Sequence, residues 1–223
     1  AKDFTSFKKS FGLSVLLALI SGLFWFSVAS FFGKVILQFY ISDASVIQNG
    51  LAYLNIAKFS YFPLALSFVF NMTYRNINRP KVPLIIGIIA MIMNIVVNYV
   101  LIFGLYGFPR MGIQGAAMGT CIAQMSSLCI HVLYAYQTKQ PFIGSFQEMF
   151  TFDRYFIQPI LQKTQSIVFN ELLFGFGSTL FIKAFGALGT RSMDAYYVGE
   201  KISNVFYAFA NGFSNAVAAI VGY

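Results

Sequence analysis

The sequence predicts an all-helical integral membrane protein with six transmembrane helices. Of its 223 residues, 58% are hydrophobic and only 10% are charged, whereas soluble domains average about 45–50% apolar and about 25% charged residues. The mean hydropathy is +0.70. The apolar residues form long runs without a sustained period of two, which favours transmembrane helices over a barrel.

Each predicted helix follows from a run that reaches the roughly 20 apolar residues needed to cross a bilayer. Lys58 and Glu171 are the only charged residues inside the first five runs, and Arg110 alone separates the third run from the fourth. The last helix is expected to begin before its uncharged run, near Ser192. The six runs are residues 11–32, 51–74, 82–109, 111–138, 164–182 and 202–223.

The basic residues favour an N-terminus in the cytoplasm. That orientation puts nine of them inside and five outside, and basic loops are retained preferentially on the cytoplasmic side. We therefore expect a multi-pass protein of the cell membrane, in a bacterium the inner membrane, with both chain ends cytoplasmic. The inner set is Lys2, Lys8, Lys9, Arg75, Arg79, Lys81, Lys139, Arg154 and Lys163; the outer set is Lys34, Lys58, Arg110, Lys183 and Arg191.

The segment 139–163 is predicted to separate two helical bundles. It is long and rich in aromatic residues, and two interpretations remain open: a short helix in the membrane interface, or a linker that covers helix ends. The predicted organisation is an N-terminal part, residues 1–138, this cytoplasmic linker, and a C-terminal part, residues 164–223.

Polar residues inside the predicted helices are the candidates for function, because ionisable and amide groups are costly in a bilayer. Glu171 can hold a proton or a cation; the alternative is a carboxyl that braces two helices. Asn94 and Asn98 lie one turn apart on one face, so their oxygens can ligate a cation. Spacing alone favours hydrogen bonds between helices for this pair.

The last helix carries a polar stripe. At 100° per residue its four members fall at about 0°, 40°, 20° and 60° around the helix axis. Such a stripe is expected to face protein or water, either as one wall of a hydrated cavity or in hydrogen bonds to another helix. The four residues are Glu200, Asn204, Asn211 and Asn215.

Other features favour packing over chemistry. Gly115 and Gly119 form a small-residue packing face, and His131 has no acidic residue nearby, so a structural role is favoured. Lys34, Lys58 and Lys183 are expected near the outer helix ends. The sequence has no cluster of metal ligands and no catalytic motif, so we expect neither an enzyme nor a cofactor beyond a coupling ion.

Several stretches of the sequence carry a family resemblance. Asn94–Gly104 and Gly107–Thr120 resemble the fifth and sixth helices of multidrug and toxic compound extrusion (MATE) transporters. Asn170–Gly177, with Leu188–Thr190, is similar to the seventh helix of that family and the turn after it. Further similarity covers Tyr74–Pro83, which resembles the basic loop before the fifth helix, and Gly212–Gly222, which resembles the end of the eighth.

The resemblance implies a fold and a transport function. The six helices would be helices three to eight of a twelve-helix transporter with two lobes, and the chain would be a fragment, in keeping with a start at Ala1 instead of Met and an end at Tyr223 inside an apolar run. Members export cationic, amphipathic drugs or toxins in exchange for Na⁺ or H⁺ by alternating access. Small organic cations and membrane lipids are thus the expected partners, and nucleic acid is not.

The resemblance also assigns residues to coupling. Asn94 and Asn98 match positions of the N-lobe cation site, Thr120 matches a sixth-helix site position, and Glu171 matches the C-lobe coupling carboxylate. Na⁺ would bind at Glu171 or at the asparagine pair. The chain departs from the family in having Asn98 where some branches carry Asp, Lys163 where Pro is common, and Asn78 in place of a loop glycine.

Two other functions remain open. A flippase for lipid-linked saccharides shares the architecture, but such proteins hold pyrophosphate with several buried basic residues. Here the buried charges are few and include acids, which favours cationic cargo. The second alternative is a truncated membrane scaffold that does not transport.

Overall fold

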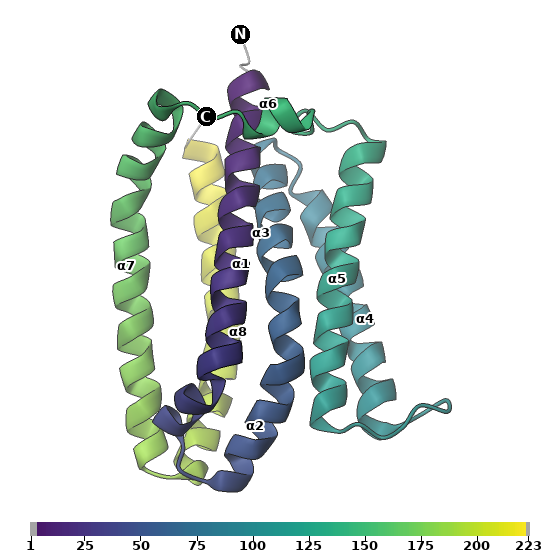
Figure 1. Ribbon diagram of the computed structural model, residues 1–223, viewed down its shortest axis with the longest axis vertical. Helices are drawn as coiled ribbons and strands as arrows, with labels where there is room; N and C mark the ends of the chain where they lie inside the picture. The colour runs from purple at the N-terminus through teal and green to yellow at the C-terminus, as the bar shows by residue number, and fades with distance from the viewer. Residues whose placement is uncertain (1–3, 222–223) are drawn as a thin grey trace. The chain divides into compact units, whose positions relative to one another are not determined.

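The computed structural model describes residues 4–221, except the side chains of residues 190, 215, 216 and 218–221. All regular structure in this part of the chain is helical (Figure 1), which confirms the predicted all-α class. The elements are α1 Phe4–Tyr40, α2 Ala44–Ala57, the 3₁₀ turn η1 Lys58–Ser60, α3 Tyr61–Asn76, α4 Lys81–Phe103, α5 Ile113–Gln137, α6 Phe146–Phe150, α7 Arg154–Ala187 and α8 Thr190–Val221.

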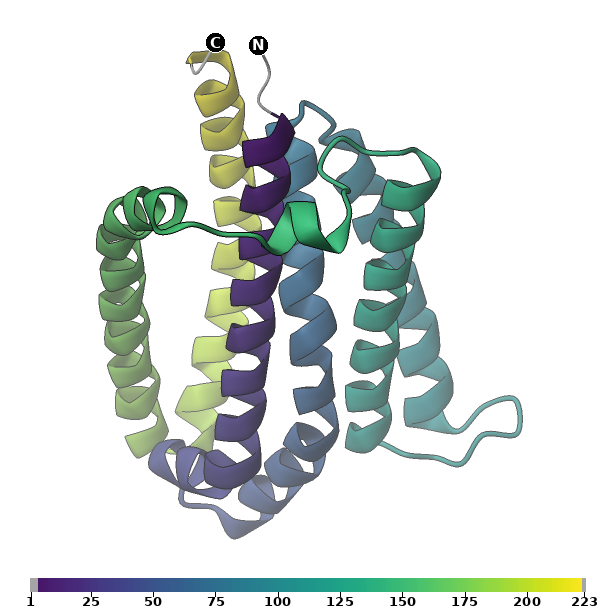
Figure 2. The ribbon, with the colours of Figure 1, turned by 45° about the horizontal axis from the view of Figure 1, so that its top comes forward.

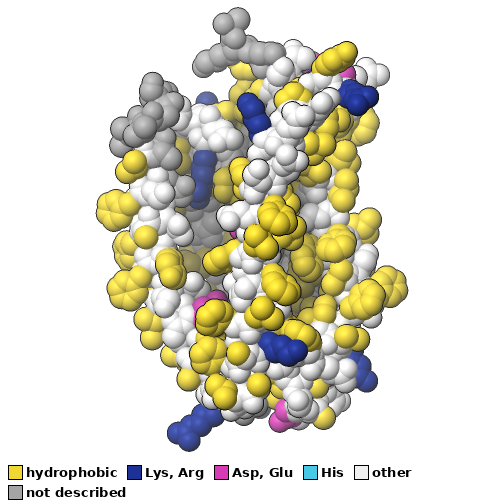
Figure 3. Space-filling view, turned by 90° about the vertical axis from the view of Figure 1, so that its left-hand side faces the viewer, with side chains coloured by type: hydrophobic (Ala, Val, Ile, Leu, Met, Phe, Trp, Pro, Cys, Tyr) yellow, Lys and Arg dark blue, Asp and Glu magenta, His cyan; other side chains and the backbone are white. Residues whose placement is uncertain are grey.

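Five helical segments within the described residues are long and apolar enough to cross a membrane. Figure 3 shows hydrophobic side chains along the full height of one face. The sixth predicted span coincides with α8, which has 32 residues and is not among these five; several side chains near the end of α8 lie outside the described residues. The five are Phe4–Tyr40, Ala44–Asn76, Lys81–Phe103, Ile113–Gln137 and Arg154–Ala187.

The helix α7 begins ten residues before the run from which it was predicted. Residues 154–163 were expected to be linker, and the structure places them in α7. Two features favour a helix here. The side chain of Asp153 accepts a hydrogen bond from the Phe156 N–H at 2.7 Å, which caps the first turn. After this first turn, apolar residues continue at helical spacing. Pro159 lies inside the helix.

The chain forms two compact units. The first contains the chain up to Leu37 together with Ala44–Lys163, and the second contains Gln38–Asp43 together with the chain from Thr164. In the second unit, α7 and α8 are joined by a tight turn at Gly189 (φ 99°), and the Lys183 ammonium lies 3.8 Å from the centroid of the Phe39 ring.

Close packing of α4 against α5 organises the first unit. A Cβ atom added to Gly115 would lie 2.8 Å from the Leu101 carbonyl, and one added to Gly119 would collide with the Asn98 side-chain oxygen. The predicted small-residue face is thus confirmed as a close helix contact. The helix α5 also packs against α2 and α3.

An aromatic cluster closes the end of this unit where α1 begins. Phe11, Phe70, Tyr74 and Phe142 are buried together, with the Phe11 and Phe70 rings 5.2 Å apart and the Tyr74 and Phe142 rings 5.4 Å apart. The loop after α3 starts at this cluster. Its residue Asn78 has φ 59°, in the left-handed region that glycine favours and asparagine tolerates, which explains how asparagine can stand at the predicted glycine position.

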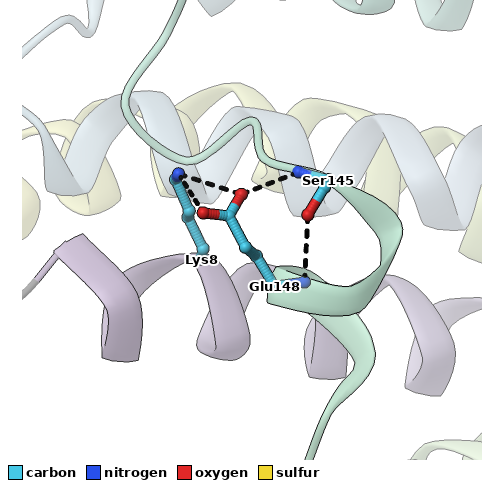
Figure 4. Close-up of polar contacts among 3 residues, drawn as sticks. All are labelled: Lys8, Ser145 and Glu148. Carbon is cyan, nitrogen blue, oxygen red and sulfur yellow. Dashed lines mark hydrogen bonds and ion pairs between the residues drawn. The ribbon is translucent and has the colours of Figure 1, made fainter.

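The short helix α6 is fixed to α1 by polar contacts (Figure 4). The Lys8 ammonium lies 3.2 Å from both carboxylate oxygens of Glu148. Ser145 and Glu148 form a capping box: the Ser145 N–H donates to the Glu148 carboxylate at 2.8 Å, and the Glu148 N–H donates to the Ser145 hydroxyl. These bonds close the first turn of α6 and orient it on α1.

We predict that adding a methyl group at Gly119 lowers stability. Gly119→Ala places a Cβ against the Asn98 oxygen, and overpacking of this kind costs about 1–3 kcal/mol. The measurement is the midpoint of thermal unfolding in detergent. The matched control is Gly87→Ala on α4, where the added Cβ meets no atom within 4 Å; alanine there favours the helix by about 1 kcal/mol. Equal midpoints for the two variants would contradict the close contact.

We predict that α6 detaches from α1 in acid. The Ser145 N–H, and then Lys8, hold the pKa of the Glu148 carboxyl below its usual value. Because the pKa of Glu148 is lowered in the folded protein, the ion pair gives its full stabilisation above the ordinary carboxyl pKa of about 4.3. This stabilisation is lost as the pH falls through the lowered pKa.

The measurement is the distance between spin labels at Thr5→Cys and Gln147→Cys, with the other cysteines replaced by serine. The distance distribution is expected to be narrow at neutral pH and to broaden as the pH falls below the ordinary carboxyl pKa and through the lowered pKa of Glu148. In the control Glu148→Gln it is expected to be broad at every pH. A distribution that stays narrow throughout for Glu148→Gln would show that the ion pair does not hold α6.

Candidate functional site

The asparagine pair on α4 forms as predicted. The Asn98 amide nitrogen donates a hydrogen bond to the Asn94 side-chain oxygen at 3.0 Å, and both side chains are half-buried. This bond connects residues one turn apart on the same helix. It orients the amide of Asn98 so that its own oxygen faces away from Asn94.

The oxygen of Asn98 is buried and has no hydrogen-bond partner among the described residues. It faces Gly119 of α5, where any side chain would displace it. Buried amide oxygens nearly always have a partner, and one left without costs about 1–3 kcal/mol. Such an oxygen can accept a hydrogen bond or ligate a cation.

Thr120 follows Gly119 on α5 but does not bond to the pair. Its hydroxyl donates to the Ala116 carbonyl of its own helix at 3.0 Å. The structure thus brings Asn94 and Asn98 together and gives Thr120 a local partner. A role for Thr120 as a ligand remains a prediction.

A break in the second span lies beside the same part of α5. The Cys121 thiol donates to the Ile56 carbonyl at 3.2 Å, and the turn η1 follows at once. Lys58, in this turn, lies 5.4 Å from the centroid of the Phe26 ring. It directly follows the last residue of α2, within the 33-residue segment Ala44–Asn76, and its place toward the outer side of the membrane remains a prediction. Hydropathy alone could not reveal the break.

A groove of about 970 Å³ runs between α1 and α3. Its walls are mainly apolar, with Trp25, Tyr61, Phe68 and Met72 among them, and α1 and α3 run side by side in Figures 1 and 2. Asn94 and Asn98 do not line it. Sequence analysis did not find this groove. The sequence did contain one signal of it, the helical spacing of Ser14, Ser21 and Trp25 on one face of α1. These residues line a groove only because α3 packs beside them.

The candidate residues of the second unit lie on the surface of the described structure. Glu171 is exposed on α7, and no residue of that helix is buried. On α8, Glu200 is half-buried, and Asn204 and Asn211 are exposed. The side chain of Asn215 lies outside the described residues. The coupling role of Glu171 and the cavity-lining role of the stripe therefore remain predictions.

His131 is a buried polar residue whose partners the sequence did not indicate. Only 1% of its surface is exposed; its Nδ1 lies 2.8 Å from the Ser127 carbonyl and its Nε2 lies 3.0 Å from the Asn71 side-chain oxygen. The Tyr74 hydroxyl donates to the His131 carbonyl at 3.4 Å. The histidine thus ties α5 to α3, in agreement with a structural role. The described residues contain no cluster of metal ligands.

Comparison with known proteins gives concordant results. The family model MatE matches residues 1–100. A probable multidrug resistance protein NorM of Thermotoga maritima is 21% identical over 94% of this chain and 45% of its own length. NorM-named relatives of Agrobacterium fabrum and Rhizobium meliloti are 29% and 23% identical, over 76% and 99% of this chain and 37% and 47% of their own lengths. No solved structure matches.

The helices and these matches together indicate an all-helical membrane protein that crosses the bilayer several times. Over residues 1–100 the chain is similar to the MatE family, and over most of its length it is similar to proteins named as probable multidrug resistance proteins. It spans about half the length of the curated relatives that it matches.

We predict that removing the His131 imidazole destabilises the first unit. In His131→Leu the half-buried Asn71 side chain loses the ring nitrogen that lies 3.0 Å from its oxygen, and a buried polar group left without a partner costs about 1–3 kcal/mol. Thermal unfolding in detergent measures the loss. The control is Cys129→Ala, an exposed position on the same helix, which is expected to change stability by less than about 0.5 kcal/mol. An unchanged midpoint for His131→Leu would exclude the histidine as a tie between α3 and α5.

Proposed function

We propose that the full-length protein containing this chain is a cation-coupled antiporter that exports organic cations. The observation that carries the proposal is the buried, unpartnered oxygen of Asn98 beside Asn94, inside a helix that is apolar enough to span a membrane. The matched relatives give independent support, since they are named probable multidrug resistance proteins.

The chemistry of the asparagine pair favours Na⁺ over H⁺ at this position. An amide oxygen is a good ligand for a hard cation but cannot take up and release a proton near neutral pH. The sequence has no acidic residue between Asp43 and Glu148, so α2, α3, α4 and α5 offer no carboxylate to share a proton. A cation bound here would replace the missing partner of the Asn98 oxygen.

Glu171 has different chemistry. It is the only acidic residue of α7, and a carboxyl can hold either a proton or a metal cation. We propose that it couples transport in the second part of the chain. Coupling requires that the ion binds one arrangement of the protein more tightly than the other, since only this difference shifts their populations.

The α1–α3 groove supports the assignment of the cargo. Trp25, Tyr61 and Phe68 offer ring faces to a cation, and Met72 offers an adaptable apolar surface. The polar stripe of α8 would form a hydrated wall. We further propose a bacterial inner membrane as the location, with the N-terminus inside, as the basic residues favour.

Transport by the full-length protein in lipid vesicles tests the proposal. A fluorescent organic cation is loaded, and its movement is followed under an imposed Na⁺ gradient and, separately, a pH gradient. We expect Asn98→Ala to reduce Na⁺-driven transport about tenfold, the effect of losing about 1.4 kcal/mol of ion binding. We expect Glu171→Gln to abolish transport driven by the pH gradient.

The matched control is Asn55→Ala, which removes an exposed asparagine from α2 and should leave both rates unchanged. Full transport by the double variant Asn98→Ala/Glu171→Gln would overturn the proposed coupling sites. Absence of transport in the unmodified protein under both gradients, with correct insertion, would overturn the antiport function itself.

A further inference from the structure

The segment 138–156 lies at one end of the first unit, where three candidate spans begin or end. The helix α1 begins at Phe4, α5 ends at Gln137 and α7 begins at Arg154, and Figures 1 and 2 show α6 crossing beside the first turns of α1. A segment tied to the ends of three spanning helices is held at the level of the lipid headgroups.

One side of this segment is fixed to the protein. Phe142 is fully buried in the aromatic cluster, and the Met149 carbonyl abuts Gly12 of α1 so closely that no side chain fits between them. The Lys8–Glu148 ion pair adds a third attachment (Figure 4). The segment therefore has a defined inner side and a defined outer side.

The outer side carries a row of aromatic rings. Successive ring centroids are 4.6 Å apart for Phe146 and Phe150, 6.3 Å for Phe150 and Phe152, and 6.4 Å for Phe152 and Phe156. Phe146 is 77% exposed and the neighbouring Tyr155 is 91% exposed, whereas Phe150, Phe152 and Phe156 are half-buried. We call these five residues the aromatic row. Aromatic side chains are enriched at membrane–water interfaces, where one part of the ring system is apolar and the other wet.

The charges around the aromatic row are almost all positive. Lys139, near the start of the segment 138–156, and Arg154, near its end, are both exposed. The exposed residues Arg75, Arg79 and Lys81 lie in the last turn of α3, in the loop after it and at the start of α4. Tyr74, beside Arg75, contacts the segment through the Phe142 ring. The two acids of the segment are both engaged: Glu148 pairs with Lys8, and the Asp153 carboxylate accepts the Phe156 N–H.

We propose that the aromatic row is a membrane-docking surface that seats in the headgroup region of an anionic lipid leaflet. The rings would lie at the level of the acyl–headgroup boundary, and the basic residues would bind lipid phosphates. Polybasic segments next to a membrane are attracted to anionic lipids in this way, and an apolar face beside them adds to the binding.

The experiment reports the surroundings of position 146 in the full-length protein. Phe146→Cys is labelled with an environment-sensitive fluorophore in a background whose other cysteines are serine. The protein is placed in nanodiscs of phosphatidylcholine or of phosphatidylcholine with one-third phosphatidylglycerol. Tyr106→Cys is the matched control, because Tyr106 is an aromatic residue, 87% exposed, in the loop between α4 and α5.

We expect a nitroxide lipid labelled near its headgroup to quench the fluorophore at 146, about twofold more in the anionic nanodisc. The double variant Lys139→Gln/Arg154→Gln is expected to remove this difference, whereas Arg110→Gln is not. The fluorophore at 106 is expected to show no dependence on lipid charge.

Three results would overturn the proposal. Reaction of the fluorophore at 146 with an aqueous reductant as fast in nanodiscs as in free solution would place the row in water. Shielding from the reductant without quenching by the nitroxide lipid would show that protein covers the row. Quenching that is equal in the two nanodiscs would likewise exclude an anionic lipid surface as the partner.

Discussion

The close approach of α4 and α5 is the contact on which the first unit depends. A hydrophobic effect between helices is absent in lipid, so association rests on packing and on polar contacts. Gly115 and Gly119 let the two helices approach, and this approach buries the Asn98 oxygen without a partner. The contact between α4 and α5 thus contains both a close approach of two helices and a polar group with unused hydrogen-bonding capacity.

The position of α5 also determines what surrounds the broken second span. Cys121 of α5 bonds to the Ile56 carbonyl just before η1, so the 3₁₀ turn lies beside the part of α5 that meets Asn98. A mid-helix 3₁₀ stretch often marks a hinge or a strained sequence. Lys58 occupies this turn and finds a ring face rather than a carboxylate, since no acid is present in α2 through α5.

Sequence reasoning succeeded where the determining interactions are local. The runs of apolar residues predicted six spans, and five of them coincide with described helical segments that are apolar enough to cross a membrane. The spacing of four residues predicted the Asn94–Asn98 pair. It failed where a structural feature depends on contacts between segments that are far apart in the sequence. The unpartnered Asn98 oxygen depends on α5, and the α1–α3 groove depends on two helices far apart in the chain.

Some missed features did have a local signal. Ser145 and Glu148 have the S-x-x-E spacing of a capping box, which predicts the start of α6, and Asp153 predicts the start of α7 ahead of the apolar run. Both were obscured because the segment was interpreted by its aromatic content. The proposed coupling residues are a different case. Glu171 and the α8 stripe lie on helices with little burial in the second unit, so no contact among the described residues marks them as a site.

The distribution of acids separates the two parts of the chain chemically. From Phe4 to Gln147, Asp43 is the sole acidic residue, and it lies between α1 and α2 outside any span. The interior of the first unit can therefore bind a cation only through neutral oxygens, whereas α7 and α8 carry carboxyls at Glu171 and Glu200. Neutral ligands respond to cation concentration and not to pH near neutrality, but carboxyls respond to both. The chain thus offers two kinds of candidate ligand for the proposed coupling ion, and changing the ion concentration and the pH separately distinguishes between them.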